Sequence, residues 1–207
     1  MTLPNQLTIL RIILTPVFAV TLMRDEMYFK YISLIIFIVA SLTDWYDGYV
    51  ARKFGVTTET GKYLDPLADK LLITTSFAIF AHLNYIALWM FWVIALRDVA
   101  ITGLRWYATT TNKKFETNNF AKWKTATQML TIYLLLFWII LEQKYASLED
   151  VPTSILAIQD WNVIWNIMLF VTLYTLLSGM LYLFENRSLL KSLAIACYRV
   201  FVPTNVR

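Results

Sequence analysis

Apolar residues fall into six long segments along the chain, and the short stretches between them hold many of the polar and charged residues. Each segment is close to the ~20 residues that an α-helix needs to cross the hydrocarbon core of a membrane. The pattern therefore predicts an all-α integral membrane protein with six transmembrane helices. The predicted helices cover residues 7–23, 29–51, 63–82, 85–108, 124–142 and 162–184.

Two shorter segments, one near each end of the chain, predict short helices that lie on the membrane surface. Residues 2–6 lead into the first apolar segment. Residues 189–201 are apolar but carry basic side chains, which is typical of an interfacial helix. Because the six spans and their loops use up the remaining length, we expect a single membrane domain over residues 1–207 with no separate soluble domain.

The composition agrees with this class, since 58% of the residues are hydrophobic and a soluble domain is nearer half apolar. The lone cysteine, Cys197, excludes an internal disulfide and argues against a metal cluster built on cysteines. The basic residues lie between the apolar segments and form no single patch, so we expect membrane lipids and no nucleic acid among the partners.

Lys and Arg residues are distributed unevenly over the two sides of the predicted bundle. With six spans both termini share one side, and only Arg24, Lys30 and Lys144 of the 18 basic residues belong to the other. Basic loops face the cytoplasm, so we expect both termini there. The first residues resemble neither a signal peptide nor a mitochondrial presequence, which favours a multi-pass protein of the cell (inner) membrane.

Four aspartates lie in or beside the second and third apolar segments, where an ionisable residue is costly and by default functional. On a helix, Asp44 and Asp47 share one face with Gly48 beside them. Asp65 and Asp69 are one turn apart on the next helix. Together these faces predict an all-oxygen site for two Mg²⁺ or Mn²⁺ ions that opens toward the cytoplasm. Such sites serve phosphoryl-type displacements, and we predict Asp69 as the base toward an attacking hydroxyl.

A purely structural explanation of the four aspartates is also open. Arg52, Lys62 and Lys70 lie nearby in the sequence, and each could neutralise one acid in an ion pair. We favour the metal site because four acids exceed what local pairing needs.

Basic residues gather farther along the chain, in the fourth and fifth predicted helices. Arg97 lies deep in the fourth helix beside Asp98, Arg105 lies near its end, and Lys122 and Lys124 open the fifth. If the four cations converge beside the aspartates, they form a pocket for the phosphate of an acceptor. The alternatives are that Arg97 and Asp98 form a structural pair, and that the two lysines only flank the membrane.

The spacing of the aspartates resembles the signature of the CDP-alcohol phosphotransferases, D-x2-D-G-x2-A-R-x8-G-x3-D-x3-D, which covers residues 44–69 here. Four other segments are similar to the branch of that family that makes phosphatidylglycerophosphate. They are residues 4–11, 64–70, 97–105 and 121–129, the last with Ala121 where the motif usually begins with glycine. The fixed positions of the signature are filled by Asp44, Asp47, Gly48, Ala51, Arg52, Gly61, Asp65 and Asp69.

The resemblance implies a homodimer of six-helix protomers that binds CDP-diacylglycerol, with the nucleotide at the aspartates and the acyl chains in the bilayer. Asp44, Asp47 and Asp65 would bind metal, and Asp69 would serve as ligand and base. The positions that the resemblance assigns to CDP-diacylglycerol are Asn5, Thr8, Gly48, Ala51, Arg52, Thr58 and Gly61.

We therefore expect an enzyme that transfers the phosphatidyl group of CDP-diacylglycerol to sn-glycerol 3-phosphate and releases CMP. Phosphatidylglycerol as acceptor, which would give cardiolipin, or another alcohol stays open as an alternative. An intramembrane prenyltransferase would carry a second aspartate-rich motif far along the chain, and the later spans offer only Asp98 and Asp160. A cation transporter would need polar residues that continue to the outer side, and the later segments lack them.

Overall fold

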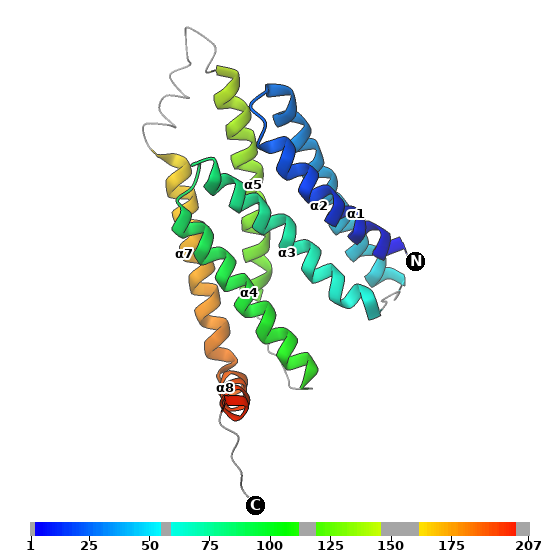
Figure 1. Ribbon diagram of the computed structural model, residues 1–207, viewed down its shortest axis with the longest axis vertical. Helices are drawn as coiled ribbons and strands as arrows, with labels where there is room; N and C mark the ends of the chain where they lie inside the picture. The colour runs from blue at the N-terminus through cyan, green and yellow to red at the C-terminus, as the bar shows by residue number, and fades with distance from the viewer. Residues whose placement is uncertain (1–2, 55–58, 112–118, 146–161, 202–207) are drawn as a thin grey trace, which may run out of the picture.

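The computed structural model describes residues 3–54, 59–111, 119–145 and 162–201, and over these residues it consists of helices alone (Figure 1). In these ranges the structure does not describe the side chains of some residues, namely 3–4, 51–52, 54, 59–66, 119–122 and 196–201. The helices are α1 (Leu3–Leu22), α2 (Met27–Phe54), α3 (Glu59–His82), α4 (Leu88–Thr110), α5 (Asn119–Tyr145), α7 (Val163–Glu185) and α8 (Arg187–Phe201).

The prediction of an all-α protein with membrane-spanning helices is confirmed in its coarse form. In the part of the chain that the structure describes, α1, α2, α5 and α7 are long and apolar enough to cross a membrane. The helix α4 falls short of that measure because Arg97, Asp98 and Arg105 interrupt it. The helix α3 is described in full only over residues 67–82, which is too short a stretch for that measure. The predicted count of six spans is therefore not confirmed.

The long helices run alternately up and down and pack into one elongated bundle (Figure 1). Helix α1 packs against α2 and α3, and α7 packs against α4 and α5. The contacts of α5 with α2 and of α3 with α4 join the two groups. As a result the end of α2, the end of α4, the start of α5 and the end of α7 all lie toward the same end of the bundle, which also carries α8.

A core of aromatic and aliphatic side chains holds the middle of the bundle together. Phe18 of α1 lies 5.6 Å from Phe37 of α2, and Phe37 meets the edge of Tyr133 of α5 at 4.9 Å between ring centroids. Phe77 and Phe80 extend this core along α3. Large apolar side chains also point outward from every long helix, as a lipid environment requires.

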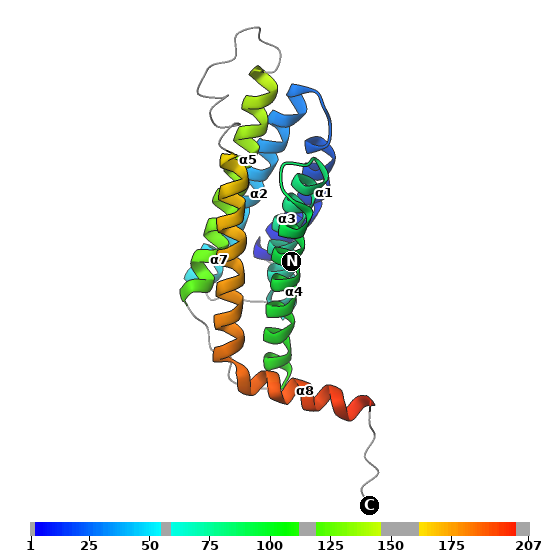
Figure 2. The same ribbon diagram turned by 90° about the vertical axis from the view of Figure 1, so that its left-hand side faces the viewer.

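The two predicted surface helices have different outcomes. The one at the C-terminus is present as α8, which runs across the end of the bundle (Figure 2) and packs through Leu189 onto Leu104 and Ala108 of α4. The one at the N-terminus is not a separate helix, because α1 is already helical from Leu3. Pro4 falls in the first turn of α1, where its missing N–H leaves no hydrogen bond unmade.

The start of the fourth helix also differs from the prediction. The sequence predicts helix from residue 85, whereas α4 begins at Leu88. Asn84 adopts a left-handed conformation with φ of 63°, and the carbonyl of Phe80 accepts a hydrogen bond from the N–H of Tyr85 at 2.9 Å. This turn ends α3 and delays α4 by one turn.

Candidate functional site

Two of the predicted metal ligands meet at one buried arginine. Asp44 and Asp47 lie in the second half of α2, and both form ion pairs with the guanidinium of Arg11 on α1. The Nη2 atom of Arg11 donates to Oδ2 of Asp47 at 2.5 Å. Arg11 is only 1% exposed, so its charge is balanced by these acids rather than by water. The two carboxylates therefore converge as the sequence predicts.

Arg11 itself was not predicted as a partner of the aspartates. The structural explanation considered only the bases that are near them in sequence, Arg52, Lys62 and Lys70. Arg11 is 36 residues away from Asp47 and reaches it because α1 and α2 pack side by side. The sequence signal was present, since Arg11 is the last residue of the N-terminal segment that carries the family resemblance.

The third helix brings Asp69 to the same end of the bundle. Asp69 is 28% exposed, and its Oδ2 atom lies 3.9 Å from Nζ of Lys70. The structure places residue 65 in α3, one turn before Asp69, and does not describe its side chain. Among the side chains that are described, no three Asp, Glu, His or Cys residues form a group that could hold a metal ion.

The residues that the sequence assigns to CDP-diacylglycerol are described only in part. Thr8 is buried and Asn5 is half-buried in the first turns of α1, and Gly48 follows Asp47 on α2. Thr58 lies outside the described residues. Ala51, Arg52 and Gly61, like Lys122 of the acceptor set, lie in helices whose side chains there are not described.

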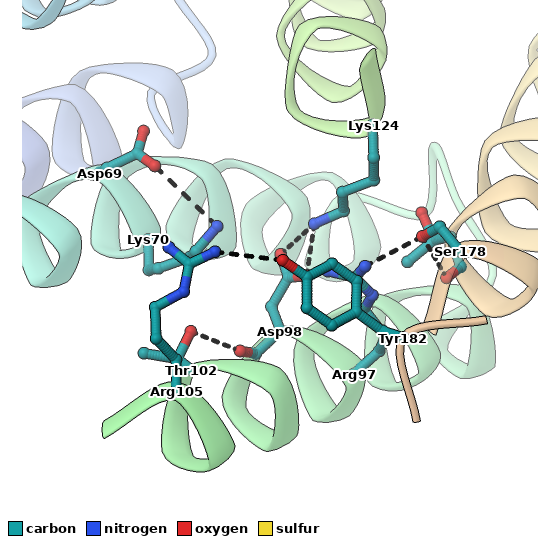
Figure 3. Close-up of polar contacts among 10 residues, drawn as sticks. Asp69, Lys70, Arg97, Asp98, Thr102, Arg105, Lys124, Ser178 and Tyr182 are labelled. Carbon is teal, nitrogen blue, oxygen red and sulfur yellow. Dashed lines mark hydrogen bonds and ion pairs between the residues drawn. The ribbon is translucent and has the colours of Figure 1, made fainter. Parts of the chain in front are cut away.

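A buried ionic cluster lies at the junction of α4 and α5 (Figure 3). Lys124 is 1% exposed and contacts both carboxylate oxygens of Asp98, with Nζ at 2.5 Å from Oδ2. Arg97 donates from Nη1 to Oδ1 of Asp98 at 3.2 Å. Asp98 is thus held by two cations from two helices, and Lys124 lies inside the protein rather than at its margin.

Residues of α7 line the other side of this ionic cluster. The sequence did not predict that α7 takes part in it. Arg97 donates from Nη2 to Oγ of Ser178 at 3.0 Å, and its guanidinium lies 6.0 Å from the ring centre of Tyr182. Arg105 donates from Nη2 to the hydroxyl of Tyr182 at 3.3 Å. Gly179 also lines this side, because a Cβ atom there would lie 2.9 Å from Cγ of Arg97.

Asp69 lies beside Lys70, and Lys70 lies toward the basic residues of the cluster (Figure 3). Asp69 and Lys70 lie on α3, and Arg97, Arg105 and Lys124 approach from α4 and α5. The ammonium of Lys70 acts electrostatically on both Asp98 and Lys124. An anion bound among these cations would therefore lie next to the carboxylate of Asp69.

The donor set fits a hard divalent cation. Carboxylate oxygens are the ligands that Mg²⁺ and Mn²⁺ prefer, and Arg11 already brings two carboxylates to one point. Asp44 and Asp69 keep 39% and 28% of their side chains exposed, so oxygens remain accessible to an ion or a diphosphate. Mg²⁺ commonly binds through one or two carboxylates and substrate phosphates, which this arrangement allows.

Comparison with known proteins links this site to one family. Residues 1–172 match the family described as CDP-alcohol phosphatidyltransferase. A relative from Bacillus subtilis named CDP-diacylglycerol–glycerol-3-phosphate 3-phosphatidyltransferase is 35% identical over 202 residues, which cover 92% of this chain and 97% of the relative. One of the same name from Haemophilus influenzae is 36% identical over 143 residues, covering 65% and 75% of the two chains. A cardiolipin synthase (CMP-forming) from Oryza sativa is 34% identical over 150 residues, which cover 66% of this chain and 46% of that protein.

Proposed function

The chain belongs to the CDP-alcohol phosphatidyltransferase family, and from that premise we infer its reaction. It is an enzyme of phospholipid synthesis that transfers the phosphatidyl group of CDP-diacylglycerol to sn-glycerol 3-phosphate and releases CMP. The relatives from two bacteria that bear this activity in their names support the assignment. The alternative acceptor, phosphatidylglycerol, is represented by the cardiolipin synthase, of which the alignment covers less than half.

The choice of acceptor rests on the charge of the cation cluster, which consists of Lys70, Arg97, Arg105 and Lys124. These four cations face two described carboxylates, those of Asp69 and Asp98, so the formal charge is +2. A phosphate monoester carries about −1.5 to −2 at neutral pH. A positively charged site attracts glycerol 3-phosphate more strongly than a phosphodiester such as phosphatidylglycerol, which carries one negative charge.

In the proposed reaction the free primary hydroxyl of glycerol 3-phosphate attacks the β-phosphorus of CDP-diacylglycerol. A new P–O bond forms to that hydroxyl oxygen, the P–O bond to CMP breaks, and CMP leaves with the bonding electrons. Asp69 accepts the hydroxyl proton, as a carboxylate does in other phosphoryl transfers. The cation cluster holds the acceptor phosphate, so that two anions can lie side by side with their charges compensated.

The proposed cofactor is Mg²⁺ or Mn²⁺, with two ions bound by Asp44, Asp47, Asp65 and Asp69. When bound, such ions neutralise charge on the diphosphate and on the departing CMP. Arg11 orients two of these carboxylates toward one point. Asn5, Thr8, Gly48, Ala51, Arg52, Thr58 and Gly61 are the proposed contacts of CDP-diacylglycerol, while Arg97, Arg105, Lys122 and Lys124 bind the acceptor phosphate.

We further propose that the chain forms one membrane domain over residues 1–207, with its catalytic motif at 44–69, six spans, and both termini and the site on the cytoplasmic side of the cell membrane. The helices α3 and α4 cross the membrane despite their charges because their polar faces meet each other inside the bundle. The proposed assembly is a homodimer.

The experiment that tests this function is an acceptor comparison with the purified protein in detergent. CMP release is measured with CDP-diacylglycerol and Mg²⁺ while glycerol 3-phosphate, phosphatidylglycerol, inositol phosphate and serine are offered separately. Of these four acceptors, we expect release with glycerol 3-phosphate and with none of the other three. Release with phosphatidylglycerol instead would move the protein to the cardiolipin-forming branch, and release with none of them would refute the proposed reaction.

Gly179→Ala is predicted to weaken acceptor binding without loosening the fold. The new Cβ would lie 2.9 Å from Cγ of Arg97, so the arginine side chain must shift away from Ser178. We expect the KM for glycerol 3-phosphate to rise by about 10-fold, the loss of one charge-assisted contact. Gly103→Ala is the matched control, since nothing lies within 4 Å of the added atom. Equal KM values in the two variants would show that Gly179 has no part in placing Arg97.

Arg11→Met is predicted to make stability depend more strongly on metal. Without Arg11, Asp44 and Asp47 repel each other unless a divalent ion neutralises them. We expect Mg²⁺ to raise the melting temperature of the variant by about 3–6 °C more than that of the wild type, both measured against EDTA. Arg24→Met, at an exposed position, serves as the control. An equal response to Mg²⁺ in all three proteins would mean that Arg11 and the metal do not share these carboxylates.

A further inference from the structure

Lys70 lies between the two halves of the site, and it is the member of the cation cluster that the sequence did not assign to the acceptor phosphate. Its Nζ atom is 3.9 Å from Oδ2 of Asp69, a distance at which charges attract but no hydrogen bond forms. Its charge also acts on Asp98 of α4 and Lys124 of α5. Figure 3 shows its ammonium on the side of α3 that faces the other cations.

The other described cations of the cluster are already bound to protein groups. Lys124 is 1% exposed and contacts both oxygens of Asp98. Arg97 donates to Asp98 and to Ser178, and Arg105 donates to Tyr182. Lys70, by contrast, is 28% exposed and makes no hydrogen bond among the described residues. All three of its N–H donors are therefore available to an anion.

We propose that Lys70 binds the phosphate of the acceptor and thereby selects phosphorylated over unphosphorylated alcohols. This rests on the proposed function, which it deepens by one specificity-determining residue. Because Lys70 adjoins the base Asp69, the same small molecule can place its phosphate on Lys70 and present its hydroxyl to Asp69. A dianion attracts this ammonium more strongly than the single, distant carboxylate does.

The charge of the cluster predicts how removing Lys70 changes the binding of the acceptor. Among the described groups, removing Lys70 lowers the formal charge from +2 to +1, so the remaining cations attract a phosphate monoester less strongly. Loss of Lys70 therefore weakens the binding of glycerol 3-phosphate. The rate of CMP release with glycerol stays unchanged, because glycerol has no phosphate.

The test compares Lys70→Met, Lys70→Gln and Lys70→Arg with the wild type, and uses Lys144→Met at the far end of α5 as the control. CMP release from CDP-diacylglycerol is followed against glycerol 3-phosphate and against glycerol, and titration calorimetry measures glycerol 3-phosphate binding directly. We expect Met and Gln to raise the KM and the Kd for glycerol 3-phosphate by about 10- to 100-fold, the loss of a contact between charged groups. The kcat, the KM for CDP-diacylglycerol and the rate with glycerol stay within about threefold, and Arg restores most of the affinity.

The outcomes separate this inference from the function on which it rests. Wild-type activity with glycerol 3-phosphate and an unchanged KM and Kd in folded Lys70→Met or Lys70→Gln would overturn the role of Lys70 alone. An equal loss of CMP release with glycerol 3-phosphate and with glycerol would also overturn this role, because it would show general damage to the site. A wild type that releases no CMP with any acceptor would overturn the proposed function, and the role of Lys70 with it.

Discussion

Replacing Asp69 with asparagine is expected to lower CMP release by about 10²- to 10⁴-fold, the usual contribution of a positioned base. Asparagine keeps the shape of the side chain but cannot take the proton from the attacking hydroxyl. Because Asp69 is 28% exposed and its ion pair with Lys70 is long, the melting temperature should change little. The measurement is the initial rate of CMP release at saturating CDP-diacylglycerol, glycerol 3-phosphate and Mg²⁺.

The control for this variant is Asp25→Asn, at an exposed position in the turn between α1 and α2, at the opposite end of the bundle. It should keep the wild-type rate. If Asp69→Asn retains more than about a tenth of the wild-type rate, Asp69 is not the base, since removing a base costs at least ~10²-fold. The proton would then have to pass to another carboxylate of the motif.

Replacing Asp98 with alanine is expected to be the most destabilising single change in the ionic cluster. Asp98 is 4% exposed and compensates Lys124, which is 1% exposed, together with Arg97. Removing one partner of a buried pair leaves a charge without compensation, which costs about 3–5 kcal/mol. For a chain of this size that corresponds to a fall in melting temperature of about 6–20 °C, measured by thermal unfolding in detergent.

A double variant separates the charge from the packing. Adding Lys124→Met to Asp98→Ala removes the uncompensated ammonium, so most of the lost stability should return although activity does not. If the double variant is no more stable than Asp98→Ala, the loss comes from the cavity rather than from the charge. In that case Asp98 is a packing residue and not the anchor of Lys124.

The helices of this protein could be predicted because each corresponds to a mainly apolar segment with polar residues at its ends. The boundaries that were missed depend on the backbone at single positions. Asn84, in a left-handed conformation, delays the start of α4, and Pro4 is absorbed into the first turn of α1. Neither effect changes the hydrophobic pattern, so the pattern could not reveal it.

The candidate site shows the same limit at the level of contacts. The convergence of Asp44 and Asp47 follows from their spacing on one helix and could be predicted. Their pairing with Arg11 could not, because it depends on which face of α1 packs against α2. Ser178 and Gly179, which contact Arg97, are 81 or more residues away from it in sequence. They lie in the most apolar helix, where the sequence pattern predicts only a packing role for polar and small residues.

The arrangement explains how two anions can react inside a membrane protein. The acids that would hold the metal come from α2 and α3, and the cations come mainly from α4 and α5. Charged residues on α3 and α4 make these helices poorly apolar, and the same residues line the site. In the proposed reaction, these charged residues bind the substrates, which accounts for the lower hydrophobicity in the middle of the chain.

The measurement that tests the central claim most directly is identification of the lipid product. Purified protein is incubated with CDP-diacylglycerol, Mg²⁺ and glycerol 3-phosphate labelled with ³²P, and the extracted lipids and the released CMP are quantified. The proposed reaction predicts label in phosphatidylglycerophosphate, one CMP for each labelled lipid, and loss of both in Asp69→Asn. CMP release with no label in the lipid would contradict it, because the phosphatidyl group would then have gone to another acceptor.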